Sequence, residues 1–197
     1  MSQTTETTNP IIQQTLEFAT DKHKFQRRKN KARDPYIVHP VEVAEILRSS
    51  GVTDTATLCG ALLHDTVEDT GTTSQELIDA FGQEVCSIVL DCSDNKSLSK
   101  VERKRLQIEH AQHISDKARL VKLADKLSNV SGLSYDPPTK WTQEEIIGYV
   151  RWSWCVCQHL YGVNSNLDDR MKSVFTQFGV ESVTDEQLND YYSRIDQ

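Results

Sequence analysis

The sequence predicts an all-α protein with a compact multi-helix fold. Apolar residues recur at spacings of three and four in most segments, which is typical of amphipathic helices. The alternation of apolar and polar residues that marks half-buried strands is missing. Hydrophobic residues make up 37% of the 197 residues and charged residues 26%. One core can therefore be buried, and general disorder is not expected.

In the first half of the chain, the periodic segments carry signals for helix starts and ends. Pro40 suits a first helical position, because proline there loses no helical hydrogen bond. Thr73 and Glu76 have the spacing of a capping box. Gly51 and Gly82 stand where helices should stop. We expect helices over residues 11–30, 40–50, 54–68, 74–82 and 83–93.

The second half shows similar signals. Thr142 with Glu145, and Thr184 with Gln187, fit capping boxes. The tripeptide at 136–138, Asp-Pro-Pro, interrupts the chain before the helix that starts near Thr142. We expect helices over residues 99–115, 117–131, 143–161, 165–178 and 185–195.

Nothing in the sequence marks a boundary between domains. We expect a flexible N-terminus over residues 1–10 and a single domain over residues 11–197. No apolar run approaches the ~18 residues of a membrane span, and the first residues lack the pattern of a signal peptide. The five cysteines form no CxxC pair, which indicates reduced thiols and a cytoplasmic protein. No membrane association and no obligatory protein partner are expected.

The charge is distributed unevenly. The formal net charge of −7 argues against a general nucleic-acid-binding protein. Residues 22–33 nevertheless contain seven basic residues and no acid, and a second basic cluster lies within residues 100–105. Such a cluster is either a solvated face or a local site for a polyanion. Residues near the basic clusters are needed to distinguish a solvated face from a polyanion site.

The segment 54–69 combines an apolar helix with acidic residues. Its helix is apolar nearly all round, so it should be buried. It runs directly into His64-Asp65-Thr66-Val67-Glu68-Asp69. Buried carboxylates are costly unless they are paired or bound to a cation. Residues 64 and 68, like 65 and 69, share a helix face. The alternative is a helix end that points into solvent.

Two further positions carry candidate ligands. His39 follows an extended Pro35–Pro40 segment and should lie at the mouth of the next helix. Asp125 lies on the polar face of the helix expected over 117–131. Taken alone, His39 reads as an ordinary capping or core histidine, and Asp125 as one half of an exposed Lys–Asp pair.

Taken in order along the chain, four short sequence motifs resemble those of the hydrolase domain of the RelA/SpoT family. The likeness extends to the small stand-alone animal SpoT homologues and covers roughly residues 10–180. The doublet His64-Asp65 is also typical of the wider class of HD-domain phosphohydrolases. The resemblance rests on four sequence motifs. The first combines Arg27-Arg28-Lys29 with Pro35-Tyr36-Ile37-Val38-His39-Pro40, and the other three are residues 61–70 (ALLHDTVEDT), residues 100–105 (KVERKR) and residues 121–129 (VKLADKLSN).

The resemblance implies a compact HD-domain fold with one divalent ion, usually Mn²⁺, with Zn²⁺ or Fe²⁺ as alternatives. By position it implies metal ligands at His39, His64, Asp65 and Asp125, and catalytic acids at Glu68 and Asp69. The substrate contacts that it implies are Arg28, Lys29, Lys100, Asn129 and Tyr149, with Trp141 beside them.

The activity that the resemblance implies is hydrolysis of guanosine 3′,5′-bis(diphosphate) to GDP and pyrophosphate. Two alternatives use the same site: removal of the 2′-phosphate of NADPH, and another HD-type nucleotide phosphohydrolase reaction. A catalytically silent nucleotide sensor would lack one of the six ligand or acid positions, and all six are filled here. The expected partner is thus a small nucleotide.

The residue types are consistent with these roles. Two imidazoles and two carboxylates suit manganese or iron better than a thiolate-rich structural zinc site. Such an ion lowers the pKa of bound water, and a nearby carboxylate can orient or deprotonate the attacking water. The basic runs would neutralise phosphates, which favours the polyanion interpretation.

One position departs from the family pattern. Glu145 stands where close relatives carry a basic residue toward the substrate. Its effect on substrate binding stays open, and it also completes the capping box with Thr142.

Overall fold

The computed structural model describes residues 9–195. Within that range the chain forms eleven α-helices and no β-structure beyond an isolated bridge between Arg27 and Pro35, which confirms the predicted all-α class. Of the expected flexible segment 1–10, only Asn9 and Pro10 lie inside the described residues. The helices are α1 (Pro10–Lys22), α2 (Val38–Ser49), α3 (Thr55–Leu63), α4 (Thr66–Thr70), α5 (Ser74–Phe81), α6 (Gln83–Cys92), α7 (Lys100–His110), α8 (Asp116–Gly132), α9 (Gln143–Cys157), α10 (Ser165–Gln177) and α11 (Asp185–Ile195).

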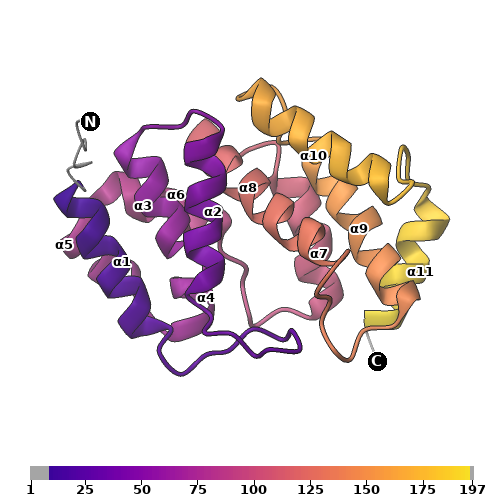
Figure 1. The fold of residues 1–197 in the computed structure, drawn as a ribbon, viewed down its shortest axis with the longest axis horizontal. Helices are drawn as coiled ribbons and strands as arrows, with labels where there is room; N and C mark the ends of the chain where they lie inside the picture. Colours follow the sequence, from indigo (N-terminus) through magenta and orange to yellow (C-terminus); the bar gives the residue numbers. More distant parts are fainter. Residues whose placement is uncertain (1–8, 196–197) are drawn as a thin grey trace, which may run out of the picture.

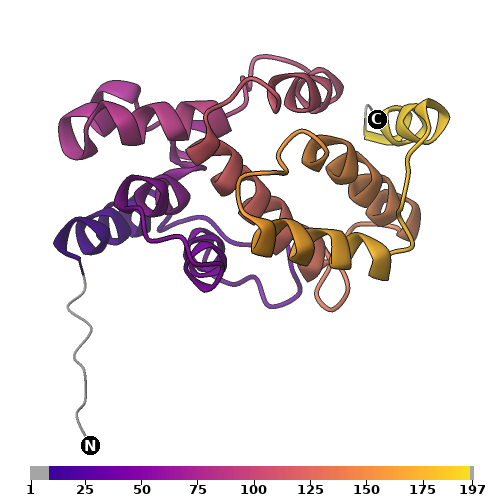
Figure 2. The ribbon, with the colours of Figure 1, turned by 90° about the horizontal axis from the view of Figure 1, so that it is seen from above.

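Helix α8 occupies the centre of the molecule. It packs against α2, α3 and α6 on one side and against α9 and α10 on the other. The N-terminal helices and the C-terminal helices therefore lie at opposite ends, with α8 running between them (Figures 1 and 2). The candidate site uses this central helix as one wall.

Helix α3 is buried on nearly all sides, as its composition predicts. Leu58 and Leu62 pack into the larger core cluster around α2 and α8, whereas Leu63 packs into a smaller cluster with α1, α5 and α6. A Cβ atom at Gly60 would lie 2.5 Å from Cγ2 of Ile88, so the close approach of α3 and α6 requires glycine there. The end of α3 is thereby held rigidly in the protein interior.

The predicted continuous helix over 54–68 is wrong, because the chain breaks at His64 and Asp65. Helix α3 ends at Leu63, and α4 begins at Thr66. The His64 ring bonds to the carbonyl oxygen of Ala61 over 2.7 Å, and the Thr66 hydroxyl donates to that of Leu63 over 2.7 Å. These side chains compete with the backbone for helical acceptors, which favours the break.

The predicted helix over 11–30 is also too long, since α1 ends at Lys22. Residues 23–37 form a loop that folds back on itself. The amide of Arg28 donates to the carbonyl of Asp34 over 2.8 Å, and that of Tyr36 donates to the carbonyl of Gln26 over 3.1 Å. Arg33 at the turn has a φ of +54°. The basic run has almost no apolar side chains to bury, so it does not extend the amphipathic helix.

Two other helices end earlier than predicted. The helix expected over 99–115 ends at His110, because Ser115 instead accepts a hydrogen bond from the amide of Ala118 and caps α8. The helix expected over 143–161 ends at Cys157, ahead of a turn in which Gly162 has a φ of +97°. The remaining helix limits agree with the prediction to within two residues.

The capping boxes Thr73–Glu76 and Thr142–Glu145 are confirmed in full. The predicted box at residues 184 and 187 also forms, with both reciprocal hydrogen bonds present. Pro40 is the third residue of α2 rather than the first, because the helix already begins at Val38. The capping box with Thr142 gives Glu145 the structural role that the spacing of the two residues predicts.

All five cysteines are free thiols, and Cys59, Cys86 and Cys157 are buried. Over residues 9–195, none of the helices combines the length and the apolar character that crossing a bilayer requires.

Candidate metal centre and active site

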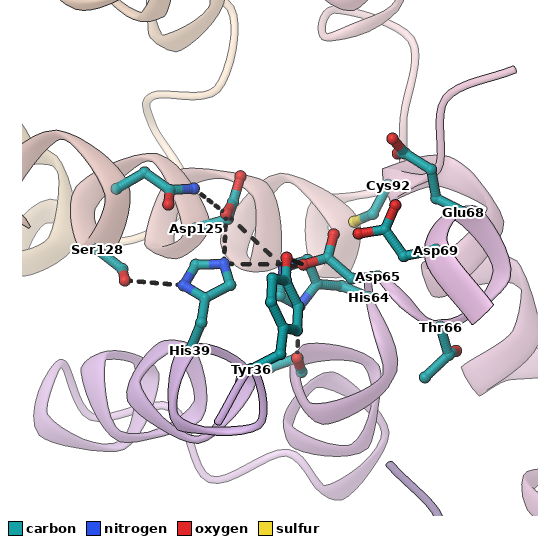
Figure 3. A network of polar contacts seen from close by, with 12 residues as sticks. Tyr36, His39, His64, Asp65, Thr66, Glu68, Asp69, Cys92, Asp125 and Ser128 are labelled. Atoms are coloured by element: carbon teal, nitrogen blue, oxygen red, sulfur yellow. Dashed lines mark hydrogen bonds and ion pairs between the residues drawn. The ribbon is translucent and has the colours of Figure 1, made fainter. Parts of the chain in front are cut away.

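The four side chains with implied ligand roles come from three packed elements. His39 lies in the first turn of α2, His64 and Asp65 form the junction between α3 and α4, and Asp125 lies in the middle of α8. Helices α2, α3 and α8 pack against one another in every pairing. The packing of these three helices therefore brings together residues that are up to 86 positions apart (Figure 3).

Three of the four side chains, His39, His64 and Asp125, converge on one point, and Asp65 lies beside the two imidazoles. Single ligand atoms of His39, His64 and Asp125 all lie within 4.8 Å of one another. Nε2 of His39 is 3.0 Å from Oδ1 of Asp125, and Nε2 of His64 is 3.7 Å from the same oxygen. Oδ2 of Asp65 is 3.1 Å from Nε2 of His64 and 3.8 Å from Nε2 of His39. Both imidazoles thus face both carboxylates.

Each imidazole is held from behind through its other nitrogen. Nδ1 of His64 bonds to the carbonyl oxygen of Ala61 over 2.7 Å, and Nδ1 of His39 lies 3.1 Å from the hydroxyl of Ser128. His39 and His64 are 1% and 4% exposed. Nε2 of His64 is buried and has no hydrogen bond of suitable alignment among the described residues. It presents a nitrogen to the centre of the cluster.

The centre is electronegative. Burial opposes a charge on His64, but Asp65 and Asp125 raise the pKa of that imidazole well above its ordinary value. Burial would raise the pKa of both carboxyls, yet His64 lowers that of Asp65, and Lys126 with His39 lowers that of Asp125. Positive charge is therefore stabilised at the point where these four groups meet.

The residues fit a divalent cation. Two nitrogen donors and one oxygen donor, from His39, His64 and Asp125, lie close enough together to share one ion, and Oδ2 of Asp65 lies within 3.8 Å of both imidazole nitrogens. The buried Nε2 of His64 is left without a hydrogen bond among the described residues. A mixed imidazole and carboxylate set suits manganese, iron or zinc. Cys92 lines the small cavity around these side chains, but it is not among the residues whose ligand atoms come together.

The two candidate catalytic acids lie on α4, directly after the junction. Oε2 of Glu68 accepts a hydrogen bond from the amide of Asp94 over 3.0 Å. Nζ of Lys96 lies 3.1 Å from Oε1 of Glu68 and 2.7 Å from Oδ1 of Asp69, so one lysine joins both acids. Burial raises the pKa of Glu68, although Lys96 acts in the opposite direction. A carboxylate with a raised pKa suits proton transfer.

A larger cavity adjoins the cluster. It has a volume of about 500 Å³ and opens beside a smaller cavity of about 190 Å³ that the four side chains line. Tyr36, Asp69, Lys96 and Asn129 line both cavities, so the two are continuous. The basic loop contributes Arg27, Arg28 and Lys29 to the larger one.

Most residues with an implied substrate contact line this larger cavity. They are Arg28, Lys29, Asn129, Trp141 and Tyr149. Lys100, the first residue of α7, is exposed and lines neither cavity. Asn129 connects the metal centre to the larger cavity. Its side-chain amide donates to Oδ1 of Asp125 over 2.6 Å, and its oxygen accepts a hydrogen bond from Nη2 of Arg28 over 3.5 Å.

One wall of the cavity is aromatic. The ring centroids of Trp141 and Tyr149 are 5.2 Å apart, and those of Tyr149 and Trp152 are 5.3 Å apart. Nζ of Lys104 lies 3.3 Å from the centroid of the Trp152 ring, behind this wall. The cavity thus combines a basic rim with a flat aromatic surface, a combination suited to a phosphorylated nucleoside.

Sequence reasoning did not single out several residues that complete the site. The hydroxyl of Tyr36 donates to Oδ2 of Asp65 over 2.6 Å, and Nζ of Lys126 lies 2.9 Å from Oδ2 of Asp125. Tyr36 and Lys126 both lie inside the sequence motifs that carry the family resemblance, so those motifs could have identified them. Lys96 and Ser128 reach the site only through tertiary packing, and no local pattern marks Lys96.

Comparisons with known proteins agree on one family. A family model described as HD domain matches residues 15–146. The chain is 48% identical over 171 residues to the guanosine-3′,5′-bis(diphosphate) 3′-pyrophosphohydrolase MESH1 of Xenopus tropicalis, covering 86% of this chain and 96% of that protein. It is 46% identical over 165 residues to the MESH1 protein of Homo sapiens, covering 83% and 92%. A solved structure matches with 42% identity and a TM-score of 0.85, covering 87% of this chain and 97% of the other; it is described as a metazoan ortholog of SpoT that hydrolyses ppGpp and plays a role in starvation responses.

Proposed function

Since this chain belongs to the HD-domain family and, within it, to the metazoan MESH1 group, we propose that it hydrolyses guanosine 3′,5′-bis(diphosphate) to GDP and pyrophosphate. The observation that carries the proposal is the convergence of His39, His64, Asp65 and Asp125 beside a cavity with a basic rim. Neither feature alone is specific, but together they bring a cation site next to a polyanion site.

The ligand set is proposed to hold one divalent ion, with Mn²⁺ as the first candidate and Zn²⁺ or Fe²⁺ as alternatives. When bound, such an ion lowers the pKa of water and polarises a phosphoryl oxygen. The protein's own contribution begins with orientation. The carbonyl of Ala61 and the hydroxyl of Ser128 hold the two imidazoles with Nε2 toward the centre.

Glu68 is the proposed general base. Its carboxylate is anchored by the amide of Asp94, and burial raises its pKa, so it can accept the proton of an attacking water. Asp69 lies beside it and shares Lys96. Lys96 is placed to keep both carboxylates oriented, and its exposed side chain can also meet a phosphate oxygen of the substrate.

The larger cavity is the proposed substrate site. Arg28 and Lys29 would bind phosphate groups, and the Trp141–Tyr149 pair would stack on the base. Asn129 would keep the substrate next to the metal centre, because it contacts both Asp125 and Arg28. As part of the same proposal, residues 11–197 act as one hydrolase domain. Cytoplasmic residence is also proposed, since all five cysteines are free.

The decisive experiment is product analysis with defined substrates. Purified full-length protein is treated with EDTA, reloaded with Mn²⁺, Zn²⁺ or Mg²⁺, and incubated with guanosine 3′,5′-bis(diphosphate) or NADPH. Release of pyrophosphate and GDP from the first compound supports the proposal. A higher kcat/KM for phosphate release from NADPH would instead favour the 2′-phosphatase activity. Lack of turnover with both compounds and every ion would refute the proposed activity and the 2′-phosphatase alternative together.

A further inference from the structure

Helix α4 carries both candidate catalytic acids, although it is only five residues long. A helix of this length is not stable by itself, because starting a helix costs more free energy than a single turn returns. The carbonyl groups of its last turn also have no amide partner within the helix. Contacts from neighbouring segments must therefore hold α4, and with it Glu68 and Asp69, in place.

The loop between α6 and α7 holds the side chains of the two acids. The amide of Asp94 donates to Oε2 of Glu68 over 3.0 Å, and Nζ of Lys96 pairs with both carboxylates. None of these contacts reaches the backbone of α4. A second group is needed to fix the course of the helix itself.

Gln26, in the basic loop, contacts the backbone of α4. Its side-chain Nε2 donates to the carbonyl oxygen of Asp69 over 2.8 Å. A carbonyl oxygen only accepts, so this contact fixes the orientation of the amide, with Oε1 facing Nδ1 of His23. Oε1 also only accepts, and His23 supplies the proton for that contact. Since His23 is 2% exposed, a buried ring holds the Gln26 side chain from behind.

Gln26 and Tyr36 hold the two ends of α4 together. The amide of Tyr36 donates to the carbonyl oxygen of Gln26 over 3.1 Å, and its hydroxyl donates to Oδ2 of Asp65 over 2.6 Å. The amide of Asp69 donates to the carbonyl oxygen of Asp65 over 2.9 Å. The four residues thus close a ring of hydrogen bonds, of which Figure 3 shows Tyr36, Asp65 and Asp69.

We propose that Gln26 is a positioning residue that holds the last turn of α4 and so keeps Glu68 and Asp69 in register with the basic loop. Its neighbours Arg27 and Arg28 line the larger cavity. One short segment therefore carries cationic groups for phosphate and sets the position of the acids. The inference rests on the proposed function in treating Glu68 and Asp69 as the catalytic acids, whereas the hydrogen bonds do not depend on it.

The two loop residues of this ring have separable effects. Tyr36 contacts Asp65, a candidate metal ligand, whereas the Gln26 side chain contacts Asp69 and His23, which are not candidate ligands. Gln26 also lines the larger cavity, but both ends of its amide are already engaged by the protein. Loss of this amide should therefore lower the rate of the chemical step and leave the binding of ion and substrate largely unchanged.

The first test is the kinetics of Gln26→Met, which keeps the length of the side chain and removes its hydrogen bonds. With Mn²⁺ and guanosine 3′,5′-bis(diphosphate), we expect kcat to fall by about 10–100-fold, because a small misplacement of reacting groups has effects of this size. KM and the Kd for Mn²⁺ should stay close to the wild type. The matched control is Gln75→Met, which removes an exposed amide that bonds to Asp79 on α5.

The second test reads the position of α4 without substrate or ion. Amide hydrogen exchange of the EDTA-treated full chain is followed by mass spectrometry in Gln26→Met and Gln26→Glu. At neutral to alkaline pH the glutamate still accepts from His23 but has no donor for the Asp69 carbonyl. We expect faster exchange in the peptide that covers α4 in both variants, and exchange in α10 as in the wild type. Gln26→Glu keeps this comparison available if Gln26→Met does not fold.

These outcomes separate the two proposals. If the wild type fails to hydrolyse either nucleotide, the proposed function is refuted, while the exchange data still decide whether Gln26 holds α4. Unchanged exchange in α4, or an equal increase in α4 and α10, would overturn the inference. An unchanged kcat in Gln26→Met would also overturn it, as would a loss of Mn²⁺ affinity as large as the loss of kcat.

Discussion

The hydroxyl of Tyr36 donates a hydrogen bond of 2.6 Å to Oδ2 of Asp65. Burial, followed by the charge of Asp65, raises the pKa of Tyr36 far above its ordinary value, so the hydroxyl keeps its proton and remains a donor. This contact fixes one oxygen of a candidate metal ligand from the loop that precedes α2. The loop with the basic residues and the metal centre are therefore joined by a direct side-chain contact.

Replacing Tyr36 by Phe should weaken the metal centre without removing a ligand. We expect the Kd for Mn²⁺ to rise by about tenfold, because the Asp65 carboxylate loses the group that orients it. Isothermal titration with Mn²⁺ measures the change. Tyr135→Phe is the control, since that side chain is 73% exposed on the surface. Equal affinities in both variants and the wild type would show that Tyr36 does not orient the ligand.

Substitutions at Asp65 and Glu68 should separate metal binding from proton transfer. Asp65→Asn is expected to lose Mn²⁺ binding and hydrolysis together. Glu68→Gln should keep the Mn²⁺ affinity while kcat falls by about 10² or more, as for loss of a general base. The amide oxygen of glutamine can still accept from Asp94, so the fold around α4 is preserved. Near wild-type kcat in Glu68→Gln would exclude Glu68 as the base.

Lys96→Ala should shift the pH dependence of hydrolysis. Burial raises the pKa of Glu68, and the ion pair with Lys96 lowers it. Removal of Lys96 leaves the effect of burial less opposed, so the pKa of Glu68 rises further. A base must be deprotonated to act, and the acidic limb of the kcat/KM profile should therefore move to higher pH. Lys172→Ala, whose ion pair with Asp169 lies on α10, should leave the profile in place.

Gly60→Ala should destabilise the protein through the contact between α3 and α6. The added Cβ would lie 2.5 Å from Cγ2 of Ile88, and overpacking of a core contact costs roughly 1–3 kcal/mol. Denaturant unfolding of the metal-free protein measures the loss. In an Ile88→Ala background the same substitution should cost less, because the clashing methyl group is gone. An equal cost in both backgrounds would argue against this clash as the cause.

Most helices could be predicted because their causes are local. A capping box, such as those at Thr73 and Thr142, depends on residues three positions apart. The apolar face of an amphipathic helix depends on residues three or four positions apart. The break at His64 and Asp65 could not be predicted in this way. Its local sequence continues the helical spacing, and the side-chain hydrogen bonds of His64 and Thr66 that replace backbone contacts are visible only in the structure.

The sequence by itself determined the all-α class, the buried character of α3 and the ordered sequence motifs that carry the family resemblance. Tertiary structure alone decided that His39, His64 and Asp125 meet at one point with Asp65 beside the two imidazoles. It also decided that Ser128 contacts His39 and that Lys96 pairs with Glu68. The physical reason is the sequence separation over which each kind of interaction acts. Helix spacing and capping act within about one turn of chain, whereas the geometry of the site depends on how α2, α3 and α8 pack across long sequence separations.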